Sequence, residues 1–248
     1  MEKVRRKPRG KSDEREVMRM EKSCSAEIAE RIPLFQDLSE QERQQLEQIL
    51  IPRHAPKKTV IFSEGDEHEA VFFIRKGLVK TSKTDDKGNE QIISILKTGD
   101  MFPHTGFFHS HPYPATATAI EDTHLWAIPI RSFEQMILNH PMMAIKMLRV
   151  MGETIRSLQL KLQQLTGHDV KYRLLAFLAQ LAENGGERQG ADMAVHLPFT
   201  HQEIANYLGT TRETVNRLLH QLVKEGTLVA DRGQVILLNW ESLKERLN

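Results

Sequence analysis

The most informative side chains of this chain follow one another between Thr211 and Leu218. Arg212, Glu213, Asn216 and Arg217 have the spacing of one face of a helix. A guanidinium group can bond O6 and N7 of guanine together, and a carboxylate can accept a hydrogen bond from N4 of cytosine. These residue types at this spacing suit the recognition of base edges in the major groove of DNA.

Capping signals predict two helices that position these side chains. Thr200 with Glu203 and Thr210 with Glu213 have the spacing of capping boxes, and Gly209 predicts a left-handed helix end between them. Two helices joined by a short turn with glycine form the helix-turn-helix pattern, whose second helix enters the major groove.

A strand, turn and strand are expected over residues 225–237, as a wing whose tip can contact phosphate. The residues expected to contact DNA are Thr200, Thr211, Arg212, Glu213, Asn216, Arg217 and Arg232.

Overall charge does not point to a nucleic acid. The net charge is +1, and from Thr200 onward six Lys and Arg balance six Asp and Glu. No apolar run approaches the roughly 18 residues of a membrane span, and residues 1–19 are too charged for a secretory signal. We therefore expect a cytoplasmic protein with no membrane partner.

The N-terminal half predicts a charged arm followed by a barrel. Residues 1–25 are expected to form a disordered basic arm, because residues 1–22 hold nine Lys and Arg with almost no apolar period. Residues 26–140 then contain short β-type runs separated by turn residues, which is typical of an all-β barrel or sandwich. The runs are Val60–Phe62, Val71–Ile74, Leu78–Val79, Ile92–Leu96 and Leu125–Ile128.

Residues 141–166 predict a dimerisation helix. Apolar residues recur there at alternating steps of three and four, which is a heptad seam that favours a second, parallel copy of the helix. Packing of this helix on its own barrel is the alternative. The seam residues are Leu148, Met151, Ile155, Leu158, Leu162 and Leu165.

Residues 167–248 predict the DNA-binding domain. It begins with an amphipathic helix over residues 171–183, and residues 184–192, with three glycines and several charges, are expected to form a polar loop. The expected fold class is α+β: barrel, long helix and winged helix-turn-helix.

From Ile28 to Leu243 the chain resembles the cyclic-AMP receptor protein and Fnr (Crp/Fnr) family of bacterial transcription regulators. The run Thr211–Arg217 is similar to the family's recognition helix, whose Arg-Glu-x-x-x-Arg reads a TGTGA half-site. The resemblance implies a jelly-roll domain of the cyclic-nucleotide-binding type, a homodimer on a palindrome, and base contacts by Arg212, Glu213 and Arg217. RNA polymerase is an implied partner of an activator. The Fnr branch lacks the first arginine, so Arg212 favours the TGTGA type.

The sensor half departs from the members that bind cyclic AMP. Tyr113 and Pro114 stand where those members carry the arginine and serine that hold the cyclic phosphate, so cyclic AMP is not expected as effector. An iron-sulfur cluster is excluded because it needs several thiolates and Cys24 is the single cysteine. The expected effector pocket contains His104, Tyr113 and Ala115, and its ligand is unknown.

Other functions stay open at this point. His104, His109 and His111 offer an axial ligand for haem or ligands for a metal, and Cys24 offers a redox switch. The same histidines in a cupin-like barrel would make a metal-dependent enzyme, although no facial set of ligands, serine elbow or phosphate loop supports this. A sensor module that binds only partner proteins is a third class. The sequence predicts a regulator rather than an enzyme and assigns no metal site.

Overall fold

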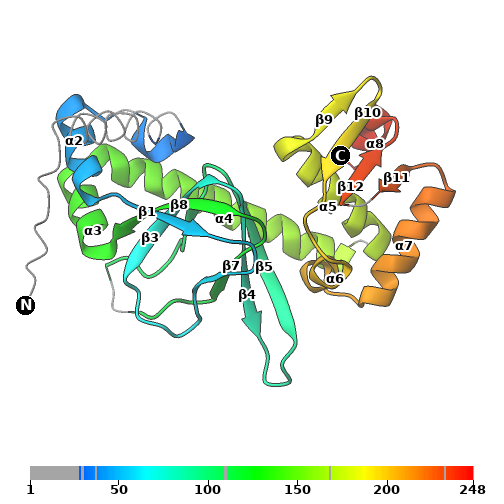
Figure 1. The fold of residues 1–248 in the computed structure, drawn as a ribbon, viewed down its shortest axis with the longest axis horizontal. Coiled ribbons are helices and arrows are strands. Elements are labelled where there is room, and N and C mark those ends of the chain that lie inside the picture. The colour runs from blue at the N-terminus through cyan, green and yellow to red at the C-terminus, as the bar shows by residue number, and fades with distance from the viewer. Residues whose placement is uncertain are drawn as a thin grey trace, which may run out of the picture.

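The computed structural model describes residues 28, 31–36, 38–108, 111–167, 169–231 and 233–247. They form an N-terminal lobe of strands and helices and a C-terminal lobe of helices and a small sheet, joined by one long helix (Figure 1). The predicted arm over residues 1–25, Cys24, His109 and Arg232 lie outside the described residues. Among the described helices, none is both long and apolar enough to cross a membrane.

The N-terminal lobe is an antiparallel double sheet, as expected. It opens with the short helix η1 (Pro33–Phe35) and helix α2 (Glu40–Ile49). One sheet has the strand order β1-β8-β3-β6 and the other β2-β7-β4-β5. The strands are β1 Ile51–Ala55, β2 Val60–Phe62, β3 Ala70–Lys76, β4 Leu78–Thr84, β5 Glu90–Lys97, β6 Met101–Phe102, β7 Thr116–Ala119 and β8 Thr123–Pro129.

Strand β3 shows how this lobe is filled, because both of its faces are buried. Since side chains alternate along a strand, Phe72 and Ile74 point between the two sheets while Val71 and Phe73 point to the helices. Helix α3 (Ile130–Asn139) covers this second face and contributes Phe133, whose ring centroid lies 5.9 Å from that of Phe73. The core is therefore layered as sheet, sheet and helices.

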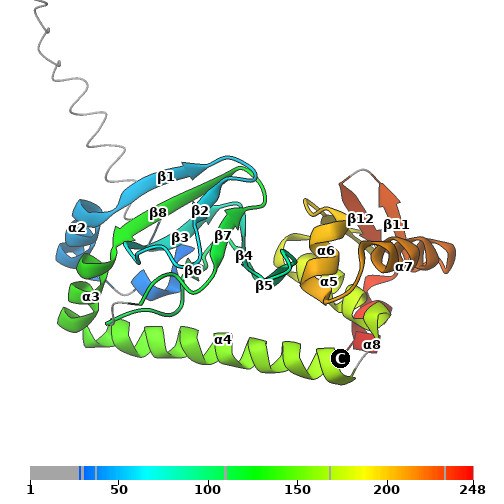
Figure 2. The ribbon, with the colours of Figure 1, turned by 90° about the horizontal axis from the view of Figure 1, so that it is seen from below.

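Helix α4 (Pro141–Gly167) runs along the N-terminal lobe and reaches the C-terminal lobe (Figure 2). Met143 and Met147 are buried against the core of the N-terminal lobe, and Met151 packs against the same core. Four of the other predicted seam residues face outward. The exposed fractions are 71% for Leu148, 57% for Ile155, 40% for Leu158 and 64% for Leu162, and the side chain of Leu165 lies outside the described residues.

The C-terminal lobe surrounds one apolar core that includes Leu174, Phe177, Ile204 and Leu219. Its sheet has the order β11-β12-β10-β9, and β11 and β12 form the predicted wing. Its elements are α5 Val170–Gly185, β9 Glu187–Gln189, β10 Asp192–His196, α6 His201–Leu208, α7 Arg212–Lys224, β11 Leu228–Asp231, β12 Gln234–Leu237 and α8 Trp240–Leu247.

The prediction of a polar loop over residues 184–192 was wrong. Helix α5 continues to Gly185, and β9 then pairs with β10 through Asp192 opposite Gln189 and Ala194 opposite Glu187. All three residues of β9 are exposed, so this strand has no apolar alternation that the sequence could reveal.

Gly77, between β3 and β4, provides a test of the N-terminal fold. Its φ is +115°, and a Cβ there would lie 2.9 Å from the Cα of Thr123. Because backbone strain and a backbone clash add, we expect Gly77→Ala to lower the free energy of unfolding by about 3 kcal/mol, measured by urea denaturation.

Gly88→Ala is the matched control, because Gly88 has a φ of +82° and no atom within 4 Å of the added Cβ. It should cost only about 1 kcal/mol. Equal losses in the two variants would contradict the role assigned to the contact between Gly77 and Thr123.

Candidate DNA interface and interlobe cavity

Helix α6 begins and ends as the sequence predicts. The Thr200 hydroxyl accepts a hydrogen bond from the backbone N–H of Glu203 at 3.2 Å, and the Glu203 carboxylate accepts one from the backbone N–H of Thr200 at 2.9 Å. Gly209 ends the helix in the left-handed region, with φ 65° and ψ 48°. These two local signals fix the turn that leads into α7.

The start of α7 differs from the prediction. Its N-cap is Thr211, whose hydroxyl accepts from the backbone N–H of Thr214 at 3.2 Å, and Arg212 is the first helical residue. The capping box expected from Thr210 and Glu213 was therefore wrong, because the residue that faces the cap is Thr214 rather than an acid. The Glu213 side chain lies in the first turn and is exposed.

Helix α7 separates its apolar and polar residues cleanly. Val215, Leu218, Leu219 and Leu222 are buried. The side chains expected to contact bases, Arg212, Glu213, Asn216 and Arg217, are all exposed on its N-terminal half. Three of them, Arg212, Glu213 and Asn216, line a hollow at the start of the helix together with Thr211.

This arrangement suits contact with the phosphates and bases of a nucleic acid. The free backbone N–H groups at a helix start favour phosphate, and the exposed polar side chains beside them present both donors and an acceptor to bases. The wing strands β11 and β12 follow α7 and pair from Leu228 opposite Leu237 to Asp231 opposite Gln234.

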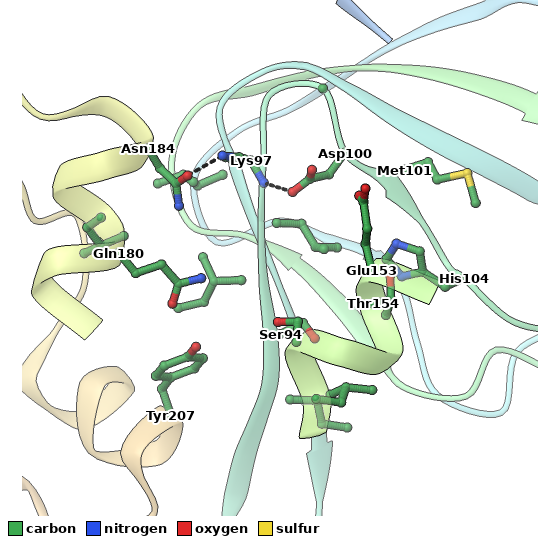
Figure 3. A pocket seen from close by; sticks show the side chains of 18 of the residues that line it. Ser94, Lys97, Asp100, Met101, His104, Glu153, Thr154, Gln180, Asn184 and Tyr207 are labelled. Atoms are coloured by element: carbon green, nitrogen blue, oxygen red, sulfur yellow. Dashed lines mark hydrogen bonds between the residues drawn. The ribbon is translucent and has the colours of Figure 1, made fainter. Parts of the chain in front are cut away.

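A cavity of about 750 Å³ lies between the two lobes, beside β5, α4 and α5 (Figure 3). His104 reaches this cavity, as do Glu153 of α4 and Tyr207 of α6. Burial lowers the pKa of His104, so that its imidazole is neutral at pH 7. Burial also raises the pKa of Asp100, although hydrogen bonding with the Lys97 backbone opposes that rise.

The structure does not bring Tyr113 and Ala115 to this cavity with His104. Tyr113 belongs to the core between the two sheets, and Ala115 is buried but does not line the cavity. The ring of Tyr113 stacks on Phe62 with centroids 3.7 Å apart, and its hydroxyl donates to the carbonyl of Ala70 at 3.1 Å. Burial raises the pKa of Tyr113, so its hydroxyl stays protonated at neutral pH.

His68 is a buried residue beside Tyr113 that the sequence analysis did not single out. Its ring centroid lies 4.8 Å from that of Tyr113, and a Cβ added to Gly106 would lie 2.6 Å from its Nδ1. Burial lowers its pKa. The segment around His68 is acidic and polar, and nothing in it indicated that the side chain turns inward. His104 and His111 do not belong to a group of three or more possible metal ligands within the described ranges.

A buried lysine connects the lobes next to the helix-turn-helix. Lys80 of β4 is 8% exposed, and its Nζ lies 2.9 Å from Glu90 Oε1 and 3.2 Å from Glu203 Oε1. Asn206 of α6 donates to Glu90 Oε2 at 3.2 Å. The carboxylate that closes the capping box of α6 therefore also holds α6 against the β4–β5 hairpin.

The two carboxylates of this cluster are held in the charged form. Burial acts to raise the pKa of Glu90, but its hydrogen bonds with Lys80, Ser82 and Asn206 lower it below 4.5. Burial likewise opposes ionisation of Glu203, and the backbone of Thr200 together with the charge of Lys80 lowers its pKa. The cluster is an ionic contact between the lobes rather than a loose surface pair.

Comparison with known proteins gives two matches to family models. Residues 52–140 match the cyclic nucleotide-binding domain, and residues 172–246 match the Crp-like helix-turn-helix domain.

Individual proteins match over most of the chain. The electron transport regulator A of Shewanella oneidensis is 32% identical over 203 residues, which cover 81% of this chain and 80% of that protein. The CRP-like cAMP-activated global transcriptional regulator of Mycobacterium tuberculosis is 28% identical over 220 residues, with coverage of 89% and 98%. The structure of FixK2 from Bradyrhizobium japonicum aligns with a TM-score of 0.70 and 26% identity, covering 79% of this chain and 96% of that one.

Removal of the lysine tests the ionic contact between the lobes. We expect Lys80→Met to lower the free energy of unfolding by about 2 kcal/mol at pH 7, because two carboxylates lose a charged hydrogen-bond partner. The folded-state pKa values of both carboxylates lie below the ordinary 4.5, so the stabilisation is complete above that pH and is lost as the pH falls through the lowered values. Urea denaturation at pH 7 and pH 4 should show the difference from wild type shrinking at the lower pH.

Lys83→Met is the control, because Lys83 lies on the same strand and forms an exposed pair with Glu64. Such a pair contributes at most about 1 kcal/mol. A Lys80 variant that matches this control at pH 7, or whose deficit is the same at both pH values, would contradict the assignment.

Proposed function

The chain belongs to the Crp/Fnr family of transcription regulators, which are not enzymes, and we propose that it acts as a homodimer on a palindromic, TGTGA-like DNA site without control by cyclic AMP. The proposal assigns residues 26–140 to sensing, 141–166 to dimerisation and 167–248 to DNA reading. The proposed location is the cytoplasm, and RNA polymerase is a further partner if the protein activates transcription.

The observation that carries this proposal is the exposed face of α7. Arg212, Glu213 and Arg217 project from the N-terminal half of a helix whose opposite face is buried. An exposed face of this kind has no role in the core, and its order Arg-Glu-x-x-x-Arg is the pattern that resembles readers of TGTGA. We assign the base contacts to these three side chains, with Asn216, Thr200, Thr211 and Arg232 at bases or phosphates.

The exposed stripe on α4 supports the homodimer. Leu148, Ile155 and Leu162 lie one heptad apart and are each more than half exposed in the single chain. Burial of a leucine or isoleucine contributes about 1.5–3 kcal/mol, so covering several of them on two chains favours association strongly. The Met143 and Met147 face packs on the chain's own core, which leaves the stripe for a second copy of α4.

The interior of the barrel supports the exclusion of cyclic AMP. A cyclic phosphate needs a cation and hydrogen-bond donors. At the position where the family's arginine is expected, Tyr113 instead stacks on Phe62 and uses its hydroxyl on the backbone of Ala70. Pro114 offers no backbone N–H. Cyclic AMP should therefore leave the DNA affinity of this protein unchanged.

The cavity between the lobes, rather than the interior of the barrel, is the position that we propose for an effector. It is lined by residues of both lobes and of α4, so a small molecule bound there would change how the C-terminal lobe sits on the N-terminal lobe. His104, neutral and partly buried, is the residue of the predicted effector pocket that reaches it.

Fluorescence anisotropy on a TGTGA palindrome at fixed salt tests the proposed base contacts. We expect Arg212→Ala to weaken binding by about 1–3 kcal/mol, because a bidentate contact to guanine is lost. Its preference at one base pair of each half-site should relax, which a set of duplexes substituted at each position measures.

Lys224→Ala is the matched control, since it removes an exposed positive charge from the far end of the same helix. It should change affinity slightly and equally for all duplexes. If Arg212→Ala keeps the full base preference of wild type, or if wild type does not distinguish the palindrome from a scrambled duplex in any effector state, the proposed contacts are wrong.

A further inference from the structure

Two histidines face each other across the outer pair of strands in the N-terminal lobe. Strands β1 and β8 run antiparallel and side by side (Figure 2). His54 of β1 is the direct partner of His124 of β8. Directly opposed side chains on one face of a sheet lie about 5 Å apart at Cβ. The two imidazole rings are stacked, with centroids 4.8 Å apart and planes inclined by 24°.

A carboxylate from the preceding turn joins this pair. Asp122 Oδ1 lies 2.8 Å from His54 Nε2, and Asp122 Oδ2 lies 3.9 Å from His124 Nε2. Within the part of the chain that the structure describes, this is the one group of three histidine, cysteine or acidic side chains whose ligand atoms all lie within 4.8 Å of one another. We refer to it as the His54–Asp122–His124 cluster.

The backbone around the cluster is held firmly. Thr123, between Asp122 and His124, is fully buried, and its hydroxyl lies within hydrogen-bonding distance of the carbonyls of Leu78 and Glu121. The absence of a side chain at Gly77 permits this close approach. The backbone positions of His54, Asp122 and His124 are thus held close together by a hydrogen-bonded turn and two paired strands, which lowers the entropy lost when their side chains converge on a ligand.

The side chains themselves are free to adjust. Their exposed fractions are 50% for His54, 66% for Asp122 and 46% for His124. Two ligands of one Zn²⁺ or similar ion lie roughly 3 Å apart, since each bond is about 2.0–2.2 Å long. The measured separations therefore require only small rotations of exposed rings to reach coordination distance.

We propose that the His54–Asp122–His124 cluster binds a divalent first-row transition metal ion, of which Zn²⁺ and Co²⁺ are the probes of choice. Two imidazoles and one carboxylate with water in the remaining positions form a donor set that such ions accept. An isolated carboxylate pair would favour Ca²⁺ or Mg²⁺ instead, because those ions prefer oxygen ligands.

The site lies where the two lobes meet. Ile120, two residues before Asp122, is part of the apolar core of the C-terminal lobe, and Glu121 Oε2 lies 3.7 Å from His196 Nε2 of β10. Lys57, three residues after His54, donates to the carbonyl of Pro198. An ion bound to Asp122 would stiffen the turn through which the N-terminal lobe contacts the C-terminal lobe.

Titration of the full chain, freed of any affinity tag and treated with chelator, tests the proposal without DNA. Addition of Co²⁺ should produce visible absorption bands that saturate at one equivalent at this site and are displaced by Zn²⁺. Each of His54→Gln, Asp122→Asn and His124→Gln should weaken Co²⁺ binding at least tenfold, since even partners that only orient a ligand account for roughly 10–100-fold in affinity.

His220→Gln, which removes an exposed histidine of α7 outside the cluster, is the matched control and should bind Co²⁺ as wild type does. The thermal midpoints of all variants in chelator should match wild type, because the altered side chains are exposed, and Zn²⁺ should raise the midpoint of wild type and His220→Gln only. Absence of saturable Co²⁺ binding, or equal binding by wild type and the three cluster variants, would overturn the proposal.

Discussion

The organisation of this molecule depends on the apolar stripe that α4 leaves uncovered. On one face of the helix, Met143 and Met147 pack against the core of the N-terminal lobe. On another face, Leu148, Ile155 and Leu162 are exposed to solvent in the single chain. Exposed leucine and isoleucine side chains at heptad spacing are unfavourable in water and favourable against an identical helix. In the proposed dimer, this single requirement sets the distance and orientation of two copies of α7, and hence the symmetry of the DNA site.

The second constraint is the contact that fixes the helix-turn-helix to the N-terminal lobe. The Glu203 carboxylate accepts hydrogen bonds from the backbone N–H of Thr200 and from Lys80 of the β4–β5 hairpin. The same side chain therefore caps the start of α6 and holds this helix against the N-terminal lobe. Apolar contact through Ile120, Leu78 and Ile95 completes the junction. The interlobe cavity and the His54–Asp122–His124 cluster both adjoin this junction, which makes it the natural place for a signal to alter α7.

The sequence predicted those features that local residues determine. The Thr200–Glu203 box and Gly209 define α6 wherever it lies, and the apolar runs of β3 and β8 reflect burial on both faces. Features set by distant parts of the chain were missed. Strand β1 exposes four of its five residues and exists because it pairs with β8, and Lys80 and Glu203 are 123 residues apart. The N-cap of α7 is Thr211 although only Thr210 has an acid three residues later, because either hydroxyl can cap a helix and the turn geometry decides between them.

Sedimentation velocity of two double variants tests directly whether a second copy of the chain covers the stripe on α4. Ile155→Asp with Leu162→Asp places two charges in the stripe, while Arg149→Asp with Arg156→Asp places two at exposed positions outside it with the same spacing. We expect a dimeric wild type, a monomeric stripe variant and a dimeric control. A stripe variant that sediments as wild type does would contradict the proposed dimer.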